Sequence, residues 1–114
     1  MENSNTVEDG KTMAIITYIT FIGLIIAFIV NNDKKNSFTA YHIRQSLGIY
    51  LLWAAVRLAY SLIASFMFFP LLSWIIYIVM IALVIIGLIA AMQGETKPVP
   101  VIGEKFQEWF KSIG

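Results

Sequence analysis

The chain contains no cysteine and only one histidine among its 114 residues. Without cysteine, the protein can have no disulfide, no thiolate metal ligand and no cysteine nucleophile. A single histidine, His42, cannot by itself build a histidine-based metal site. We also find no phosphate-binding loop and no nucleophile elbow. The sequence therefore predicts a protein that is not an enzyme and that uses no metal or other cofactor.

Charge is also scarce. Charged residues make up 13% of the chain, about half of the roughly 25% found in soluble domains. The net charge of +1 is too small for the basic surface that nucleic-acid binding needs, so we expect no nucleic-acid partner. Apart from Arg57, the charges are confined to the two tails and to residues 33–44. A bilayer imposes such segregation, because a charge in hydrocarbon is costly.

Apolar residues dominate what remains. They form 59% of the chain, the mean hydropathy is +0.77, and the thirty-seven residues from Leu58 to Gly94 carry no charge. A transmembrane helix needs ~20 predominantly apolar residues. We therefore predict an all-α polytopic membrane protein, in which a bundle over residues 12–94 contains three transmembrane helices, with spans at about 12–30, 46–69 and 72–92.

The two ends of the chain differ from the bundle. Residues 1–11 are polar and acidic and predict a disordered tail, whereas residues 95–114 begin with a proline-containing linker. A short amphipathic helix follows, because four apolar residues recur at the i, i+3, i+4, i+7 spacing. We expect this face to lie in the membrane interface, the alternative being docking in a partner's groove. The four residues are Phe106, Trp109, Phe110 and Ile113.

Lysine and arginine counts predict the orientation. With three spans, the first loop and the C-terminal tail share one side of the membrane and hold six of these residues, against Lys11 alone on the other side. The acidic N-terminus is unlike the basic start of a secretory signal, so we interpret the first apolar run as a retained anchor. We predict a multi-pass protein of the cell membrane with its N-terminus outside and its C-terminus in the cytoplasm. The six residues are Lys34, Lys35, Arg44, Lys97, Lys105 and Lys111.

Arg57 is the most informative single residue. It falls near the middle of the predicted second span, and no acidic residue lies in any span. It also belongs to a polar stripe on one helix face, which we interpret as a surface for a partner, an anionic lipid or a wet cavity. Two simpler interpretations are that Arg57 clamps two helices of this chain together, or that the helix is shifted so that Arg57 is shallower. The stripe consists of Ser46, Tyr50, Trp53, Arg57, Ser61 and Ser65.

A second polar cluster lies at the cytoplasmic entrance of the second span. We expect it either to contact lipid headgroups or a partner, or only to provide ordinary positive-inside anchoring. Its members are Lys34, Lys35, His42, Arg44 and Gln45.

Small residues four apart in the third span predict close helix packing. The two pairs are Gly87 with Ala91, and Ala90 with Gly94.

Three stretches resemble a known family: MAIITYITFIGLIIAFIV, FTAYHIRQSLGIYLLW and PVPVIGEKFQEWF. The chain is similar to small bacterial membrane proteins of a domain-of-unknown-function family, which is distantly similar to the Tic translocon import component of the chloroplast inner envelope. The resemblance is most specific at His42-x-Arg44-Gln45 and at Pro100-x-Ile102-Gly103. It implies an all-helical membrane fold in a bacterial inner membrane, and it transfers no catalytic residue.

Three functions are open at this point. The leading hypothesis is a non-enzymatic accessory or scaffold protein that binds a membrane partner through the Arg57 stripe. The second is a small channel or translocation component formed as a homo-oligomer, because three helices cannot enclose a pore alone. The third is an anionic-lipid binder that uses Arg44, Lys34 and Lys35.

Overall fold

The structure, a computed structural model, describes residues 6–65 and 70–113, and its regular elements there are all α-helices. The predicted all-helical fold class is thus confirmed. Residues 66–69, the last four of the predicted second span, and residues 1–5 of the predicted N-terminal tail lie outside the described residues. Five helices follow one another along the chain: α1 (Val7–Ile19), α2 (Phe21–Lys34), α3 (Ser37–Ala64), α4 (Pro70–Met92) and α5 (Gly103–Trp109).

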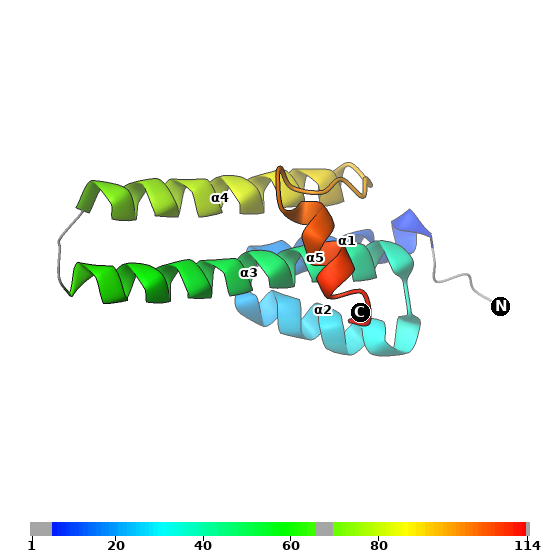
Figure 1. Ribbon diagram of the computed structural model, residues 1–114. Helices are drawn as coiled ribbons and strands as arrows, with labels where there is room; N and C mark the ends of the chain where they lie inside the picture. The colour runs from blue at the N-terminus through cyan, green and yellow to red at the C-terminus, as the bar shows by residue number, and fades with distance from the viewer. Residues whose placement is uncertain (1–5, 66–69, 114) are drawn as a thin grey trace.

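Two long antiparallel helices, α3 and α4, form the framework of the molecule (Figure 1). At ~1.5 Å per residue, the 28 residues of α3 and the 23 residues of α4 extend about 42 and 35 Å. The shorter helices α1, α2 and α5 pack against the first half of α3, and α1 also packs against the last half of α4 (Figure 1). We call this part the cap, residues 6–49 and 80–113. The rest of α3 and α4, residues 50–65 and 70–79, is the distal hairpin.

The predicted first span is not one helix. Thr20 is extended, with φ −148° and ψ 164°, and its hydroxyl accepts a hydrogen bond from the Gly23 amide at 3.0 Å. This N-cap starts a new helix, and α2 folds back against α1. A side chain at Gly23 would overlap the carbonyl oxygen of Ile16, so glycine is needed for the close approach. The unbroken hydropathy of residues 12–30 hid this break.

The start of α1 lies beside the start of α3. Asn36 Nδ2 donates to the carbonyl of Thr6 at 2.9 Å, and the Thr39 hydroxyl donates to the carbonyl of Gly10 at 3.0 Å. Residues 7–11 are therefore helical and packed, although the sequence predicted a disordered tail over 1–11. The described N-terminal residues and the first loop share one end of the molecule, whereas the predicted three-span topology places them at opposite ends.

Two of the described helices are long and apolar enough to cross a membrane, α3 and α4. Only 11% and 28% of their most apolar windows are buried, whereas the core helix of a soluble protein is mostly buried. A membrane protein explains this exposure. A third span is not found among residues 6–65 and 70–113, because α1 and α2 have only 13 and 14 residues and ~20 are needed.

Proline and glycine set the ends of α4 as their chemistry predicts. Pro70 occupies the first helical position, where its missing N–H costs nothing. Gly94 has φ +74°, and the Glu95 amide reaches back to the Ala90 carbonyl at 2.8 Å. These are the features of a Schellman motif, in which the left-handed residue favours glycine.

The C-terminal helix α5 packs on α3 and does not lie free along the membrane (Figure 1). Phe106 is 3% exposed, and its ring lies directly over Gly48, where a side chain would collide with it. Phe110 is half-buried against the core cluster that contains Phe106, and Ile113 against a second cluster that contains Leu24 and Ile43. Of the four residues only Trp109, 61% exposed, faces outward. The predicted interfacial face is therefore mainly a face of the core, because Gly48 leaves space for an aromatic ring.

Candidate functional site

The polar residues of the cap form a buried hydrogen-bonded network. The Tyr18 hydroxyl lies 2.6 Å from His42 Nδ1, and Gln45 Nε2 donates to the same hydroxyl at 3.0 Å. His42 Nε2 lies 2.8 Å from the Glu95 carbonyl. Because a carbonyl only accepts, Nε2 carries the proton, and Nδ1 accepts from Tyr18. We therefore assign a neutral imidazole to His42, whose side chain links α1, α3 and the segment after α4.

Gln45 holds the linker as well. Its Oε1 accepts from the Val99 amide at 2.8 Å, and its Nε2 also lies 3.3 Å from the Lys97 carbonyl. His42 and Gln45 are both 0% exposed. The expectation that they contact lipid headgroups is therefore wrong: their polar atoms are used to fix α1 and the linker on α3.

The basic members of the same cluster have different surroundings. Arg44 donates from Nε to the Ile113 carbonyl at 2.9 Å and from Nη2 to the Lys111 carbonyl at 3.1 Å. Lys34 and Lys35 are exposed at the end of α2, where Lys35 adopts the left-handed conformation, φ 54°. The structure thus ties Arg44 to the C-terminal segment and leaves the two lysines at the surface, so the five residues do not form one site.

The predicted Arg57 stripe is divided between the two regions. Ser46 belongs to the cap, where its hydroxyl donates to the Thr17 carbonyl and is buried. Tyr50 and Trp53 are half-buried and line a cavity, whereas Arg57, Ser61 and Ser65 are exposed on the distal hairpin. The helical spacing was predicted correctly, but it crosses from packed core to open surface, so it is not a single polar face.

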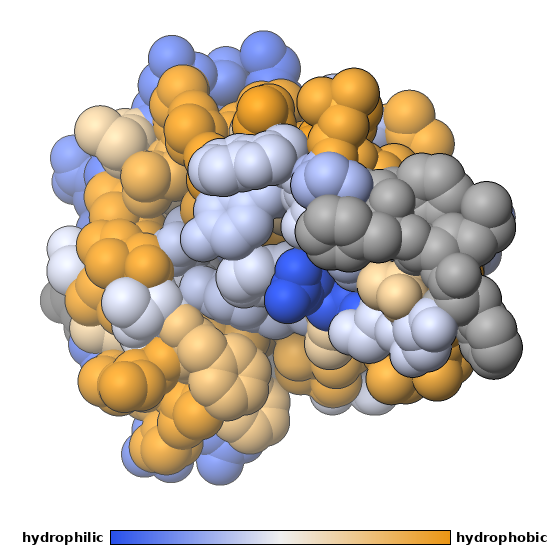
Figure 2. All heavy atoms as spheres, turned by 90° about the vertical axis from the view of Figure 1, so that its left-hand side faces the viewer, coloured by the Kyte–Doolittle hydropathy of each residue, from blue (hydrophilic) through white to orange (hydrophobic). Residues whose placement is uncertain are grey.

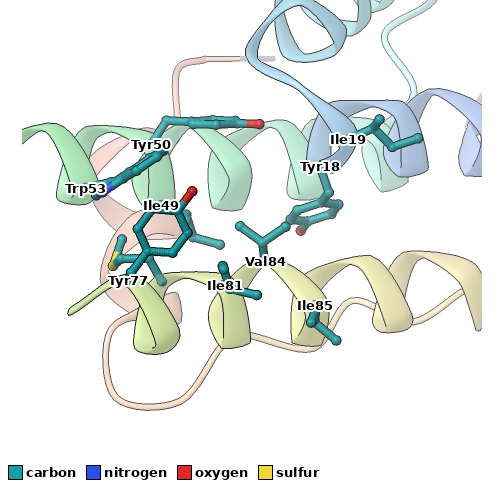
Figure 3. A pocket seen from close by; sticks show the side chains of 10 residues that line it. Tyr18, Ile19, Ile49, Tyr50, Trp53, Tyr77, Ile81, Val84 and Ile85 are labelled. Atoms are coloured by element: carbon teal, nitrogen blue, oxygen red, sulfur yellow. The ribbon is translucent and has the colours of Figure 1, made fainter. Parts of the chain in front are cut away.

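An aromatic cavity of about 240 Å³ lies between α3 and α4, just beyond the tip of the α1–α2 pair. Figure 3 shows Tyr50 and Trp53 from α3 on one side, Tyr77 from α4 on the other, and Tyr18 from α1 toward one end. The rings of Trp53 and Tyr77 meet edge to face, with centroids 5.9 Å apart. The remaining lining residues are Ile19, Ile49, Met80, Ile81, Val84 and Ile85.

Arg57 lies in a shallow depression that adjoins this cavity. Arg57, Ser73, Trp74 and Tyr77 line the depression, so Tyr77 is common to both hollows. Figure 2 looks onto this end of the molecule, where a strongly hydrophilic patch is surrounded by weakly polar and apolar surface. We call the cavity and the depression together the hairpin groove.

Two polar groups of the hairpin groove lack partners. Arg57 makes no hydrogen bond or ion pair with another described residue, and the indole N–H of Trp53 is buried without an acceptor within the same residues. The clamp interpretation of Arg57 therefore has no support among the described contacts. In the cap, His42 and Gln45 have a partner for each polar side-chain atom, whereas the Thr17 hydroxyl and Gln107 Oε1 are buried without a partner among the described residues.

Arg57 is closer to the end of the hairpin than the sequence predicted. It faces Ser73, which follows the first residue of α4, Pro70, by three positions or ~4.5 Å. Arg57 thus lies level with the first turn of α4 and eight residues before Ser65, the C-cap of α3. The sequence placed it near the midplane because the offset between α3 and α4 could not be known from hydropathy.

The small residues of α4 pack as predicted. Gly87 lies against the Tyr18 ring, and a side chain there would come within 2.5 Å of it. Ala90 and Ala91 are buried in the same interface with the cap. Because Gly87 has no side chain, the Tyr18 ring packs close to α4 and its hydroxyl reaches His42. The spacing of small residues along α4 could not predict this contact.

In the described part of the chain, no three His, Cys, Asp or Glu residues are grouped in a way that could hold a metal ion.

Comparison with known proteins gives one family. The family model described as "Magnetosome magnetite crystal formation protein family" matches residues 9–106, most of the chain. This match supports the expected small bacterial membrane-protein family and carries no evidence for similarity to the Tic component. No curated protein and no solved structure matches the chain.

Proposed function

The chain belongs to the magnetosome magnetite crystal formation protein family, and from this premise we propose that it is a non-enzymatic accessory or scaffold protein of a bacterial membrane. In this proposal the cap is the rigid structural part. The hairpin groove binds a partner within the membrane, one that presents a negatively charged group to Arg57.

The observation that carries the proposal is the unpaired guanidinium. Charged residues at membrane depth are expensive and are usually paired with another group. The described residues provide no partner for Arg57, and none of the chain's seven aspartates and glutamates lies in α3 or α4. An acidic partner would supply the missing charge.

The proposal includes a revised topology. With only α3 and α4 crossing the bilayer, the α1–α2 pair enters from the cap side and returns to it. Seven of the eight lysines and arginines then lie in the cap, and only Arg57 belongs to the distal hairpin. This bias is stronger than the six against one of the three-span topology. The positive-inside rule puts the cap end of the molecule on the cytoplasmic side of the membrane, with the start of α1 on the same side as the C-terminus.

Single cysteines test this topology cleanly because the natural chain has none. We expect Thr6→Cys and Lys111→Cys in intact cells to resist a membrane-impermeant maleimide, and both to react after lysis. Labelling of Thr6→Cys alone in intact cells would restore the three-span topology with an external N-terminus.

Binding is tested by purifying the tagged protein from native membranes in mild detergent and measuring the composition of each complex. We expect a bound component with the wild type and with Arg57→Lys, and its loss with Arg57→Leu. Ala59→Leu is the matched control, because position 59 is exposed on the opposite side of α3. Equal composition in all four proteins would overturn the proposal, and a complex containing only copies of this chain would favour the homo-oligomeric channel.

The family description supports a second candidate, a role in magnetite crystal formation as a component of the magnetosome membrane. The match over residues 9–106 is the observation that favours it. Expression in a magnetite-forming bacterium that lacks its own family members should change crystal size or number, as seen by electron microscopy. Unchanged crystals with a correctly localised protein would reject this candidate.

A further inference from the structure

We infer that the hairpin groove binds a phospholipid of the distal leaflet, with the phosphate at Arg57 and one acyl chain along the aromatic cavity. This inference rests on the proposed function and names the chemical class of its ligand. Three properties of the groove support it: the position of its polar end, its length, and its closure.

The polar end of the groove lies where headgroups are found. Trp74, 67% exposed, and Tyr77 stand beside Arg57 in the first two turns of α4. Tryptophan and tyrosine concentrate at the membrane–water interface. Ser73 adds a hydroxyl donor next to the guanidinium. A guanidinium and a hydroxyl at this depth match the charge and the hydrogen-bonding capacity of a phosphate.

The length of the groove matches one leaflet. From Ser73 to Ile85, both of which line the groove, α4 rises through twelve residues, or about 18 Å. Half of a hydrocarbon core of ~30 Å is about 15 Å. An acyl chain attached to a phosphate at Arg57 would therefore reach the inner end of the groove near the bilayer midplane.

The inner end of the groove is closed by the cap. Tyr18 and Ile19 form the last turn of α1, directly before the break at Thr20, and both line the cavity (Figure 3). An acyl chain that follows the groove inward from Arg57 would therefore stop at these two residues.

Photo-cross-linking tests the inference in cells. Benzoyl-phenylalanine replaces Tyr77, which lines both parts of the groove, and a second protein carries it at Ile78, which is 62% exposed to lipid. Irradiation followed by mass spectrometry identifies each adduct. We expect a phospholipid adduct at position 77 that falls at least about tenfold with Arg57→Leu, since hydrogen bonds to charged groups contribute ~1.5–3 kcal/mol. Arg57→Lys should retain most of it, and the adduct at position 78 should not change with any variant.

Reconstitution identifies the part of the lipid that is recognised. The purified Tyr77 probe protein is placed in phosphatidylcholine vesicles that contain either phosphatidylglycerol or diacylglycerol as a minor component. Depletion of diacylglycerol from the adduct at position 77, relative to its share of the vesicle, supports recognition of the phosphate that both phosphatidylcholine and phosphatidylglycerol carry, whereas diacylglycerol in proportion to its share contradicts it. An adduct with a second protein at position 77 would overturn the lipid inference and leave the proposed function standing. A lipid adduct insensitive to Arg57→Leu, with no bound component in the purification above, would overturn both.

Discussion

The cap and the distal hairpin share the same two long helices, yet the polar residues most conspicuous in the sequence have different surroundings in the two regions. In the cap, His42 and Gln45 are fully buried and hydrogen-bonded to α1 and to the linker. In the distal hairpin, Arg57 and the Trp53 indole have no partner among the described residues. Buried polar groups are usually hydrogen-bonded, and a polar group without a partner calls for an explanation. The conspicuous polar residues thus divide into a set with structural contacts and a set for which we propose a binding role.

The largest effect on stability is expected from Gln45→Leu. The substitution removes the amide that bonds to Tyr18, Lys97 and Val99 and leaves the buried Val99 amide without an acceptor. We expect a loss of about 3–5 kcal/mol in unfolding free energy, measured by denaturation in detergent micelles followed by circular dichroism. Ser65→Ala is the control, because within the described part of the chain that hydroxyl bonds only to the Ser61 carbonyl of its own helix. An equal loss in both variants would contradict the division into cap and hairpin.

Phe106→Ala should follow, at about 3 kcal/mol. The ring fills the space above Gly48, so its loss undocks α5 from α3. Limited proteolysis should then cut the segment after α4 much faster than in the wild type. Trp109→Ala, which removes a mostly exposed ring of the same helix, should change neither stability nor cleavage appreciably. Rapid cleavage in both variants would return α5 to a free interfacial helix.

Thr20→Ala tests the break between α1 and α2. The substitution removes the hydroxyl that caps α2, and replacing such a cap costs ~1 kcal/mol. The matched variant Thr20→Ser keeps the hydroxyl and should match the wild type. If all three proteins have the same unfolding midpoint, packing at Gly23 alone sets the break.

Arg57→Leu is expected to have the smallest effect on stability, within ~0.5 kcal/mol of the wild type or slightly stabilising. Its guanidinium has no partner to lose among the described residues. The same unfolding measurement, made in detergent without added lipid, checks this. A loss of several kcal/mol would show that Arg57 is a clamp after all, and its binding role would then lose its main support.

The comparison also separates what could be predicted from sequence from what could not. The helical class and the ends of α4 follow from local chemistry: Pro70 has no N–H to lose, and Gly94 accepts a positive φ. The break at Thr20 was missed because the hydropathy on either side is equally high. Its signal was a capping hydroxyl three residues before a glycine, a local feature that hydropathy does not record.

The roles of the polar residues depended on tertiary contacts. His42 and Gln45 were assigned to the headgroup region because basic residues flank them, but Gly87 admits the Tyr18 ring that buries them. The amphipathic pattern of α5 was predicted correctly and its environment was not, because a hydrophobic face fits a membrane and a core equally well. Arg57 could be identified from its charge alone. The groove around it could not be predicted, because it depends on the offset between α3 and α4.

The break at Thr20 also gives the molecule a shape. Because α1 and α2 turn back there, one half of the molecule has α1, α2 and α5 around α3 and α4, and the other half has only α3 and α4 (Figure 1). In the proposed orientation this is a wedge, with its broad end in the cytoplasmic leaflet and its narrow end in the opposite one. Such a protein occupies more lateral area in one leaflet than in the other, and a membrane that is convex toward the cytoplasm relieves the mismatch. In that case the helix break at Thr20, by making one end of the molecule broader than the other, would favour a curved membrane around the protein.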